Sequence, residues 1–190
     1  MSSTEIVSMP DTAGRRLKVR FFQQADRYAH SVWWVDGDSE TILLESVEGD
    51  DRAAWPPSPP LQQLTVEDRP DGGRVLLLVG MAGTSHWSLS VEPHPSDPAF
   101  LFDVACRIKG ECRRLGNQYR CHARPAAPRG PQTIEFGVAD QLIRLDSEAR
   151  GNGPAAPVEI SGETVSVHPT PPSARPPTTA RWTYRVAIAP

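Results

Sequence analysis

The sequence predicts an all-β fold in which two antiparallel sheets pack into a sandwich or a partly closed barrel. Apolar and polar residues alternate with a period of two along much of the chain, which is typical of half-buried strands. The alternating runs are short and are separated by Gly, Pro and Asp turn residues. They do not alternate with helical segments as in α/β folds. We therefore expect about ten to twelve short strands and at most one short helix.

The alternating pattern begins only after an irregular stretch. Residues 1–14 show no alternation, and we expect them to form a flexible segment ahead of one β domain over residues 15–190. The first strands are expected at 17–22, 28–35 and 41–44. An Asp-Gly-Asp turn separates the second of these strands from the third, because Asp and Gly tolerate a positive φ.

The middle of the chain predicts a meander of three strands at 61–68, 74–81 and 84–92. A Pro-Asp-Gly sequence between the first two strands is a hairpin signal. Residues 75–79 are apolar at both odd and even positions, unlike the alternating strands around them. Such a strand is typical of a central position in a sheet that is covered on both faces.

Two segments are compatible with either a strand or a helix. Residues 97–115 carry a helix-start signal, but the apolar residues of 100–108 share one strand parity. Gly110 would also cost a helix about 1 kcal/mol relative to alanine, so a strand is favoured. Its return strand is expected at 118–123. Residues 139–150 remain open between a strand and a short helix.

The remaining strands are expected at 133–138, 158–160, 165–167 and 181–188. Proline accounts for 20 of the 190 residues and is concentrated between the strands. Because proline cannot donate a hydrogen bond to a sheet, these clusters predict loops or polyproline II segments. The Pro-rich loops lie near residues 55–60, 125–131, 154–157 and 169–177.

The composition argues against several classes of function. Lys and Arg together number 20 against 23 Asp and Glu, for a net charge of −3, which is not the charge of a generic nucleic-acid binder. The first residues lack the apolar core of a secretory signal, and the longest apolar run is far shorter than the ~20 residues of a membrane helix. The three cysteines are typical of reduced thiols. We expect a soluble, cytoplasmic protein with no nucleic-acid partner, no membrane partner and no cofactor.

The densest cluster of polar residues contains Thr84, His86 and Ser88. His86 and Ser88 share one face of the expected strand, which makes them weak catalytic candidates together with Asp103 and Arg107. The G-x-S-x-G turn that presents a nucleophilic serine is absent from this part of the sequence. The alternative is a polar stripe that faces solvent or a ligand.

Tryptophans are the second group of candidates. The adjacent Trp33 and Trp34 place one indole on each face of a strand, and Trp55 precedes two prolines in a loop. An indole on a sheet face either packs in a core or offers an apolar platform for a ligand. The candidate ligand-binding residues are Trp33, Trp34, Trp55, Thr84 and His86.

Three cysteines and a histidine lie close together in the sequence as Cys106, Cys112, Cys121 and His122. Thiolates and imidazole are suitable zinc ligands, but the spacing lacks the C-x2-C knuckles of zinc fingers. Buried packing of the thiols is the favoured interpretation, and no metal is expected. A Cys106–Cys121 disulfide is disfavoured by the inferred compartment.

These observations favour a non-enzymatic binding or interaction module, since catalytic motifs are lacking while aromatic strands and Pro-rich loops are abundant. Its ligand is a protein, a peptide or a small molecule. The alternatives are a small enzyme with a pocket around His86 and Ser88 in the mouth of the sandwich or barrel, and a zinc-stabilised β domain. Pairing of sheet edges in a homo-oligomer also remains open.

Overall fold

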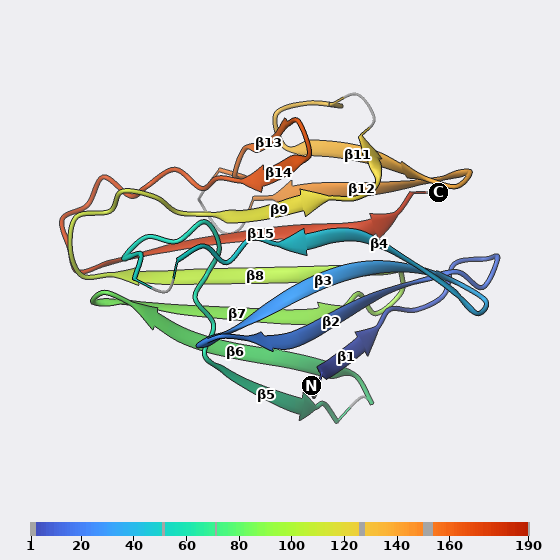
Figure 1. Ribbon diagram of the computed structural model, residues 1–190, viewed down its shortest axis with the longest axis horizontal. Coiled ribbons are helices and arrows are strands. Elements are labelled where there is room, and N and C mark those ends of the chain that lie inside the picture. The colour runs from blue at the N-terminus through green and yellow to red at the C-terminus, as the bar shows by residue number, and fades with distance from the viewer. Residues whose placement is uncertain (1–2, 51, 71, 126–127, 150–153, 190) are drawn as a thin grey trace.

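The computed structural model describes residues 3–50, 52–70, 72–125, 128–149 and 154–189, and it is all-β in these residues (Figure 1). They form two antiparallel sheets that pack face to face, and they contain no helix. Each sheet has two separate edge strands, so the sandwich is open and is not a closed barrel. The predicted fold class is confirmed.

The first sheet, sheet A, has seven strands, in the spatial order β1 (Ser3–Val7), β2 (Arg16–Gln24), β3 (Arg27–Asp36), β4 (Ser39–Ser46), β9 (Asn117–Cys121), β14 (Thr164–Val167) and β13 (Val158–Ser161). The second sheet, sheet B, has the order β10 (Arg124–Pro125), β11 (Thr133–Val138), β12 (Gln141–Glu148), β15 (Thr178–Ile188), β8 (Ala99–Ile108), β7 (Ser85–Pro93), β6 (Arg74–Ala82) and β5 (Gln63–Asp68). The described residues thus form fourteen strands of four residues or more and the two-residue β10. The expected count of ten to twelve was too low.

The two ambiguous segments are both strands. β8 covers the middle of 97–115, and its inward-facing residues are those that shared one parity in the sequence. Segment 139–150 contains β12, which pairs with β11 and β15. A strand is favoured there because both of its neighbours offer backbone hydrogen-bonding groups that a helix would leave unpaired.

The N-terminal segment differs from the expectation of a flexible stretch. Residues 3–7 form β1, which pairs with β2 along its whole length at the edge of sheet A. Only Ile6 of these five residues is buried. An edge strand with one buried side chain has little hydrophobic periodicity, which is why the sequence pattern did not indicate it.

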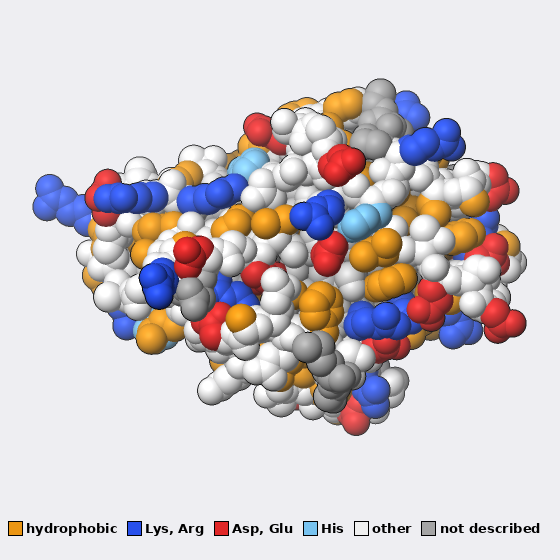
Figure 2. All heavy atoms as spheres, in the orientation of Figure 1, with side chains coloured by type: hydrophobic (Ala, Val, Ile, Leu, Met, Phe, Trp, Pro, Cys, Tyr) orange, Lys and Arg blue, Asp and Glu red, His pale blue; other side chains and the backbone are white. Residues whose placement is uncertain are grey.

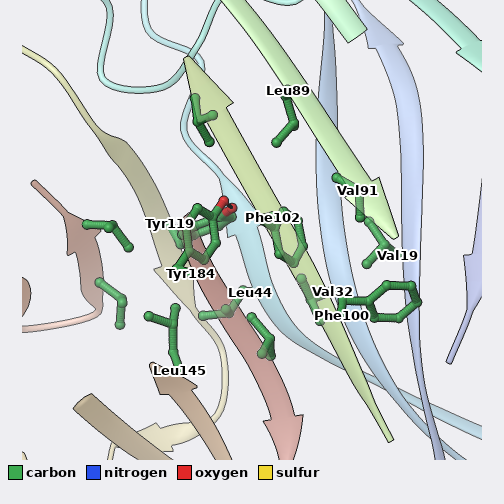
Figure 3. Close-up of a cluster of buried hydrophobic side chains, with 14 of the residues drawn as sticks. Val19, Val32, Leu44, Leu89, Val91, Phe100, Phe102, Tyr119, Leu145 and Tyr184 are labelled. Carbon is green, nitrogen blue, oxygen red and sulfur yellow. Dashed lines mark hydrogen bonds between the residues drawn. The ribbon is translucent and has the colours of Figure 1, made fainter. Parts of the chain in front are cut away.

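The core lies between the sheets and is dominated by aromatic and aliphatic side chains from both. Figure 3 shows Tyr119 of β9 and Tyr184 of β15 pointing toward each other across the interface, with Phe102 beside them. The rings of Phe102 and Tyr184 stack with centroids 4.8 Å apart. The two tyrosine hydroxyls are hydrogen-bonded to each other. Each hydroxyl therefore satisfies the other in a region that excludes water.

A buried histidine extends this tyrosine pair within sheet A. His30 Nε2 is joined to the Tyr119 hydroxyl by a hydrogen bond of 2.9 Å, and its ring stacks on Phe21 with centroids 5.0 Å apart. Burial lowers the pKa of His30 to about 3. The imidazole is therefore neutral at physiological pH, which suits its apolar surroundings.

A buried carboxyl group follows β4. The Ser46 hydroxyl donates to Glu48 Oε1 at 2.5 Å and accepts the backbone N–H of His30 at 2.8 Å. Burial raises the pKa of Glu48 to about 7. Since Glu48 is only 5% exposed, its ionisation near neutral pH places a charge in a poorly solvated site.

The Pro-rich segment before β5 connects the two sheets. The Tyr28 N–H of β3 donates to Leu61 O at 2.6 Å, and the Gln62 N–H donates to Val79 O of β6 at 2.8 Å. Trp55, in the same segment, contacts Trp87 edge-to-face with ring centroids 6.1 Å apart. The expected Pro-rich loop at 55–60 is therefore packed against the sandwich.

Gly80 of β6 allows this segment to approach sheet B closely. A Cβ atom on Gly80 would lie 1.7 Å from the carbonyl oxygen of Pro60 and 2.9 Å from the nitrogen of Gln62. Both are backbone atoms, so the overlap can be relieved only by moving the segment or the strand.

We predict that Gly80→Ala lowers the free energy of unfolding by about 2 kcal/mol or more, because the backbone of the segment must shift. Gly110→Ala is the matched control, since a Cβ there would meet nothing closer than Thr84 Oγ1 at 4.0 Å. Urea denaturation followed by tryptophan fluorescence measures both variants. Equal stability of the two variants would contradict the close approach at Gly80.

We predict that Glu48→Gln raises the free energy of unfolding, relative to wild type, more at pH 8 than at pH 4.5. A folded-state pKa raised from 4.5 to about 7 favours folding only while the group is protonated. This contribution is lost as the pH rises toward 7, and it amounts to about 3 kcal/mol at most. Unfolding free energies of wild type and variant at a series of pH values measure it. His30, which is neutral in the folded state, makes stability fall as the pH drops below the normal histidine pKa. Because this effect is the same in both proteins, it cancels in the difference between their unfolding free energies. A difference that does not change with pH would disprove the Glu48 assignment.

Candidate functional site

A groove of about 550 Å³ crosses the outer face of sheet B. It runs over β5, β6, β7, β8 and β15, at the end of the sheet where β6 turns into β7. Except for Trp87, its strand side chains point away from the core, because they have the opposite strand parity to the buried residues of the same strands. The groove is therefore a feature of the sheet surface and does not enter the sandwich.

Strand register arranges the groove side chains in two adjacent rows. The first row consists of Gln63, Val79, Ser88 and Ala105, on β5 to β8 in turn. The second row consists of Met81, His86, Arg107 and Thr179, on β6, β7, β8 and β15. Ala105 has the shortest side chain of these eight, so a larger residue at this position would occupy the volume of the groove.

Apolar side chains form the β6 end of the groove. Val79 and Met81 are each 47% exposed, and Leu77 on the same face is half-buried. The expectation that 75–79 is covered on both faces was therefore wrong. β6 lies next to the edge strand β5, and in the described residues no further layer packs on the outer face of sheet B. A continuous apolar run in the sequence does not reveal this difference, because it specifies only that both faces are apolar.

Basic side chains form the β7–β8 end. Lys109 Nζ donates a hydrogen bond of 2.8 Å to His86 Nε2, and Arg107 lies directly across the strand pair from His86. Arg107 is exposed, and it has no ion-pair partner among the described residues. Arg107 and His86 of the lining thus have a second basic side chain, Lys109, beside them.

The four catalytic candidates are only partly brought together. His86, Ser88 and Arg107 line the groove. Asp103 lies four residues before Arg107 on β8, where Arg181 Nε donates to its Oδ1 at 2.8 Å. The lone pair of His86 Nε2 accepts from Lys109, and no hydrogen bond joins His86 to Ser88 in the part of the chain that the structure describes. This arrangement lacks the base–nucleophile contact that activates a serine.

The aromatic candidates have different surroundings from one another. Trp34 is buried in the core at 6% exposure, and Trp55 packs on Trp87. Trp33 lies on the outer face of sheet A, where the Arg20 guanidinium and the Lys18 ammonium stack 4.9 and 5.9 Å from its ring centroid. These cations cover the indole that would otherwise be a platform for a ligand.

Thr84 lies in the exposed two-residue turn between β6 and β7, near the groove but outside its lining. The neighbouring His86 is therefore the one candidate ligand-binding residue from the sequence that lines the groove.

The four zinc candidates do not meet at one point, although Cys106 and Cys112 are close enough to interact electrostatically. Cys106 faces the core from β8, and Cys121 of β9 donates its thiol to Ala123 O at 3.3 Å. His122 Nε2 lies 3.2 Å from Glu45 Oε2, on the outer face of sheet A, and Cys112 lies in the β8–β9 loop. In the described residues, no three His, Cys, Asp or Glu side chains form a group that could hold a metal ion. All three thiols are free.

Sequence reasoning missed most of the groove lining. The missed residues are Gln62, Gln63, Val79, Gly80, Met81, Trp87, Ala105 and Thr179. One part of the groove had a usable signal, since the two-residue turn Gly83-Thr84 sets the register that places Met81 opposite His86. The approach of β15 to β8 had no such signal, because 69 residues separate the end of β8 from the start of β15 in the chain.

Surface charge elsewhere is mixed. Figure 2 shows one face of the molecule, on which acidic and basic side chains intermingle with hydrophobic ones. Ion pairs on the outer faces include Lys18–Glu40 at 2.5 Å and Arg144–Glu135 at 2.9 Å. The described residues contain no helix that is long and apolar enough to span a lipid bilayer.

Comparisons with known proteins add no family assignment. No protein-family model matches the chain, and no curated protein matches it in sequence. Inferences about function therefore rest on the geometry of the groove and of the buried groups.

We predict that a single thiol, Cys112, reacts with Ellman's reagent in the folded protein. Cys106 is fully buried and Cys121 is 5% exposed, and burial raises the pKa of Cys106 to about 12, which suppresses the reactive thiolate. Thiol counting at pH 8 should therefore yield about one equivalent before unfolding and three in guanidinium chloride. Rapid reaction of three thiols in the folded protein would contradict the described burial. Protection of Cys112 by added zinc would support the zinc alternative.

Proposed function

We propose that this protein is a non-enzymatic binding module whose ligand occupies the groove on the outer face of sheet B. The observation that carries the proposal is the combination of exposed apolar side chains, Val79 and Met81, with polar side chains in one cross-strand groove. An apolar surface beside a few polar groups is the usual composition of a binding site. Exposed apolar residues also lower the solubility of a monomer, so a contiguous group of them suggests a partner.

The surroundings of His86 favour binding over catalysis. Its Nε2 accepts a hydrogen bond from Lys109, so the lone pair that would take a proton from a nucleophile is engaged. The carboxylate nearest along β8, Asp103, is bonded to Arg181. A hydrolytic enzyme would need a base with a free lone pair beside Ser88.

The proposal includes a cytoplasmic location, which the three free thiols support. The zinc-stabilised alternative receives less support, because Cys106, Cys121 and His122 point to different regions of the fold. A homo-oligomer that pairs through the exposed edge strand β5 is compatible with a groove that lies beside that edge.

The proposal predicts that small polar-aromatic fragments bind preferentially in the groove. A fragment screen followed by methyl NMR spectra measures this, because Val79, Met81, Ala105 and Thr179 all carry reporter methyl groups. We expect the fragments that bind to shift these methyl signals, and we expect Ala105→Trp to abolish the shifts by filling the groove.

The control variant is Ala123→Trp, which replaces a half-buried alanine away from the groove. Melting curves establish that each variant is folded. Fragment binding elsewhere on the surface, or equal binding to Ala105→Trp, would refute the groove as the ligand site.

A further inference from the structure

We propose, on the basis of the binding function above, that the groove takes an extended segment of a partner protein that carries an apolar side chain and a carboxylate three residues apart. The apolar side chain contacts Val79 and Met81. The carboxylate contacts Arg107 and Lys109.

Among the described residues, no acid pairs with the positive end of the groove. Arg107 and Lys109 are exposed, and in the residues that the structure describes neither makes an ion pair with a carboxylate. Other cations on the outer face of sheet B are neutralised, as Arg181 is by Asp103 and Arg144 is by Glu135. An unpaired guanidinium beside an ammonium is complementary to a carboxylate, which it can bind through two parallel hydrogen bonds.

Proximity of Lys109 to His86 adds to this complementarity. An ammonium that donates to Nε2 leaves its remaining N–H groups for an incoming acceptor. His86 lies between Met81 and Arg107 in the cross-strand row. A ligand that lies across the strands therefore meets the apolar Met81, then the imidazole of His86 and then the guanidinium of Arg107.

The spacing of these groups sets the spacing in the ligand. Met81 and Arg107 belong to β6 and β8, which are separated by one strand. Adjacent strands lie about 4.8 Å apart, so the two residues are about 10 Å apart. An extended chain rises about 3.3 Å per residue, and about three residues therefore cover this distance.

The open shape of the groove favours a peptide over the other anionic ligands. It lies on a sheet face, whereas pockets for small molecules enclose most of the ligand surface. Binding of single-stranded nucleic acid relies on exposed aromatic rings for base stacking. The aromatic residue of the groove lining, Trp87, is 2% exposed and faces the core.

The test uses the full chain and three pools of ten-residue peptides with blocked termini and degenerate Gly, Ser and Thr flanks. The pools contain Leu and, three residues away on either side, Glu, Gln or Lys. Fluorescence anisotropy measures affinity, and the methyl signals of Val79, Met81 and Ala105 report the site. We expect the Glu pool to bind about fivefold more tightly than the Gln pool and the Lys pool to bind most weakly.

Arg107→Glu should abolish or reverse the preference for Glu over Lys. The matched control is Arg16→Glu, which makes the same change of net charge at an exposed position on sheet A. Raising the salt concentration should weaken binding of the Glu pool more than binding of the Gln pool.

The outcomes separate this inference from the proposed function. Groove binding that is equally tight for the Lys pool would overturn the acidic segment and leave the binding module in place. If the fragments bind in the groove but none of the peptide pools does, the acidic segment is likewise overturned and the binding module remains. If a dT12 oligonucleotide or decanoate shifts the groove methyl signals at lower concentration than the Glu pool, the anion is of another class and the peptide assignment is wrong. Absence of all binding in the groove, fragments included, would overturn both proposals.

Discussion

The contact between Tyr119 and Tyr184 is the interaction on which the rest of the structure depends. It joins the middle of sheet A to the middle of sheet B through a hydrogen bond between two buried hydroxyls. Neither hydroxyl can be left unpaired in the core without a penalty of about 1–3 kcal/mol, so the bond fixes how the sheets are positioned over each other. His30 then satisfies the remaining capacity of Tyr119 from β3. The apolar side chains of the core would tolerate several alignments of the two sheets. The buried polar groups therefore specify which alignment forms.

This alignment leaves the outer faces of the two sheets exposed, and the two faces differ. On sheet A, Trp33 is covered by Lys18 and Arg20, and these cations are paired with Glu5 and Glu40. Lys18 and Arg20 therefore have acidic partners on the face that they share with Trp33. On sheet B, Glu92 of β7 and Asp103 of β8 are paired with arginines. Arg107 has no ion-pair partner among the described residues, and Val79 and Met81 are exposed beside it. This difference supports our proposal that the ligand occupies the outer face of sheet B.

Much of the fold was predictable because strand periodicity is a local property. Alternation in 17–22, 28–35 and 100–108 identified β2, β3 and β8. The pattern failed where burial is not alternating. β1 buries one side chain of five, and β6 is apolar on a face that no layer covers in the described residues. In both cases the sequence pattern shows which residues are apolar, but it does not show which of them are buried.

The candidate site was predictable in one part only. His86, Ser88 and Arg107 were indicated as polar residues on strands, and they line the groove. Val79, Met81 and Ala105 were not indicated, since apolar residues in a strand are ordinarily interpreted as core.

The sequence by itself determined the class of fold, the parity of each long strand and the residues that are able to form a polar face. The tertiary structure decided which strands became neighbours and which apolar face stayed uncovered. It also left Arg107 without an acid among the described residues. The physical reason is that strand pairing between distant segments, such as β8 with β15, depends on the packing of the whole core, and no local pattern of residues encodes it.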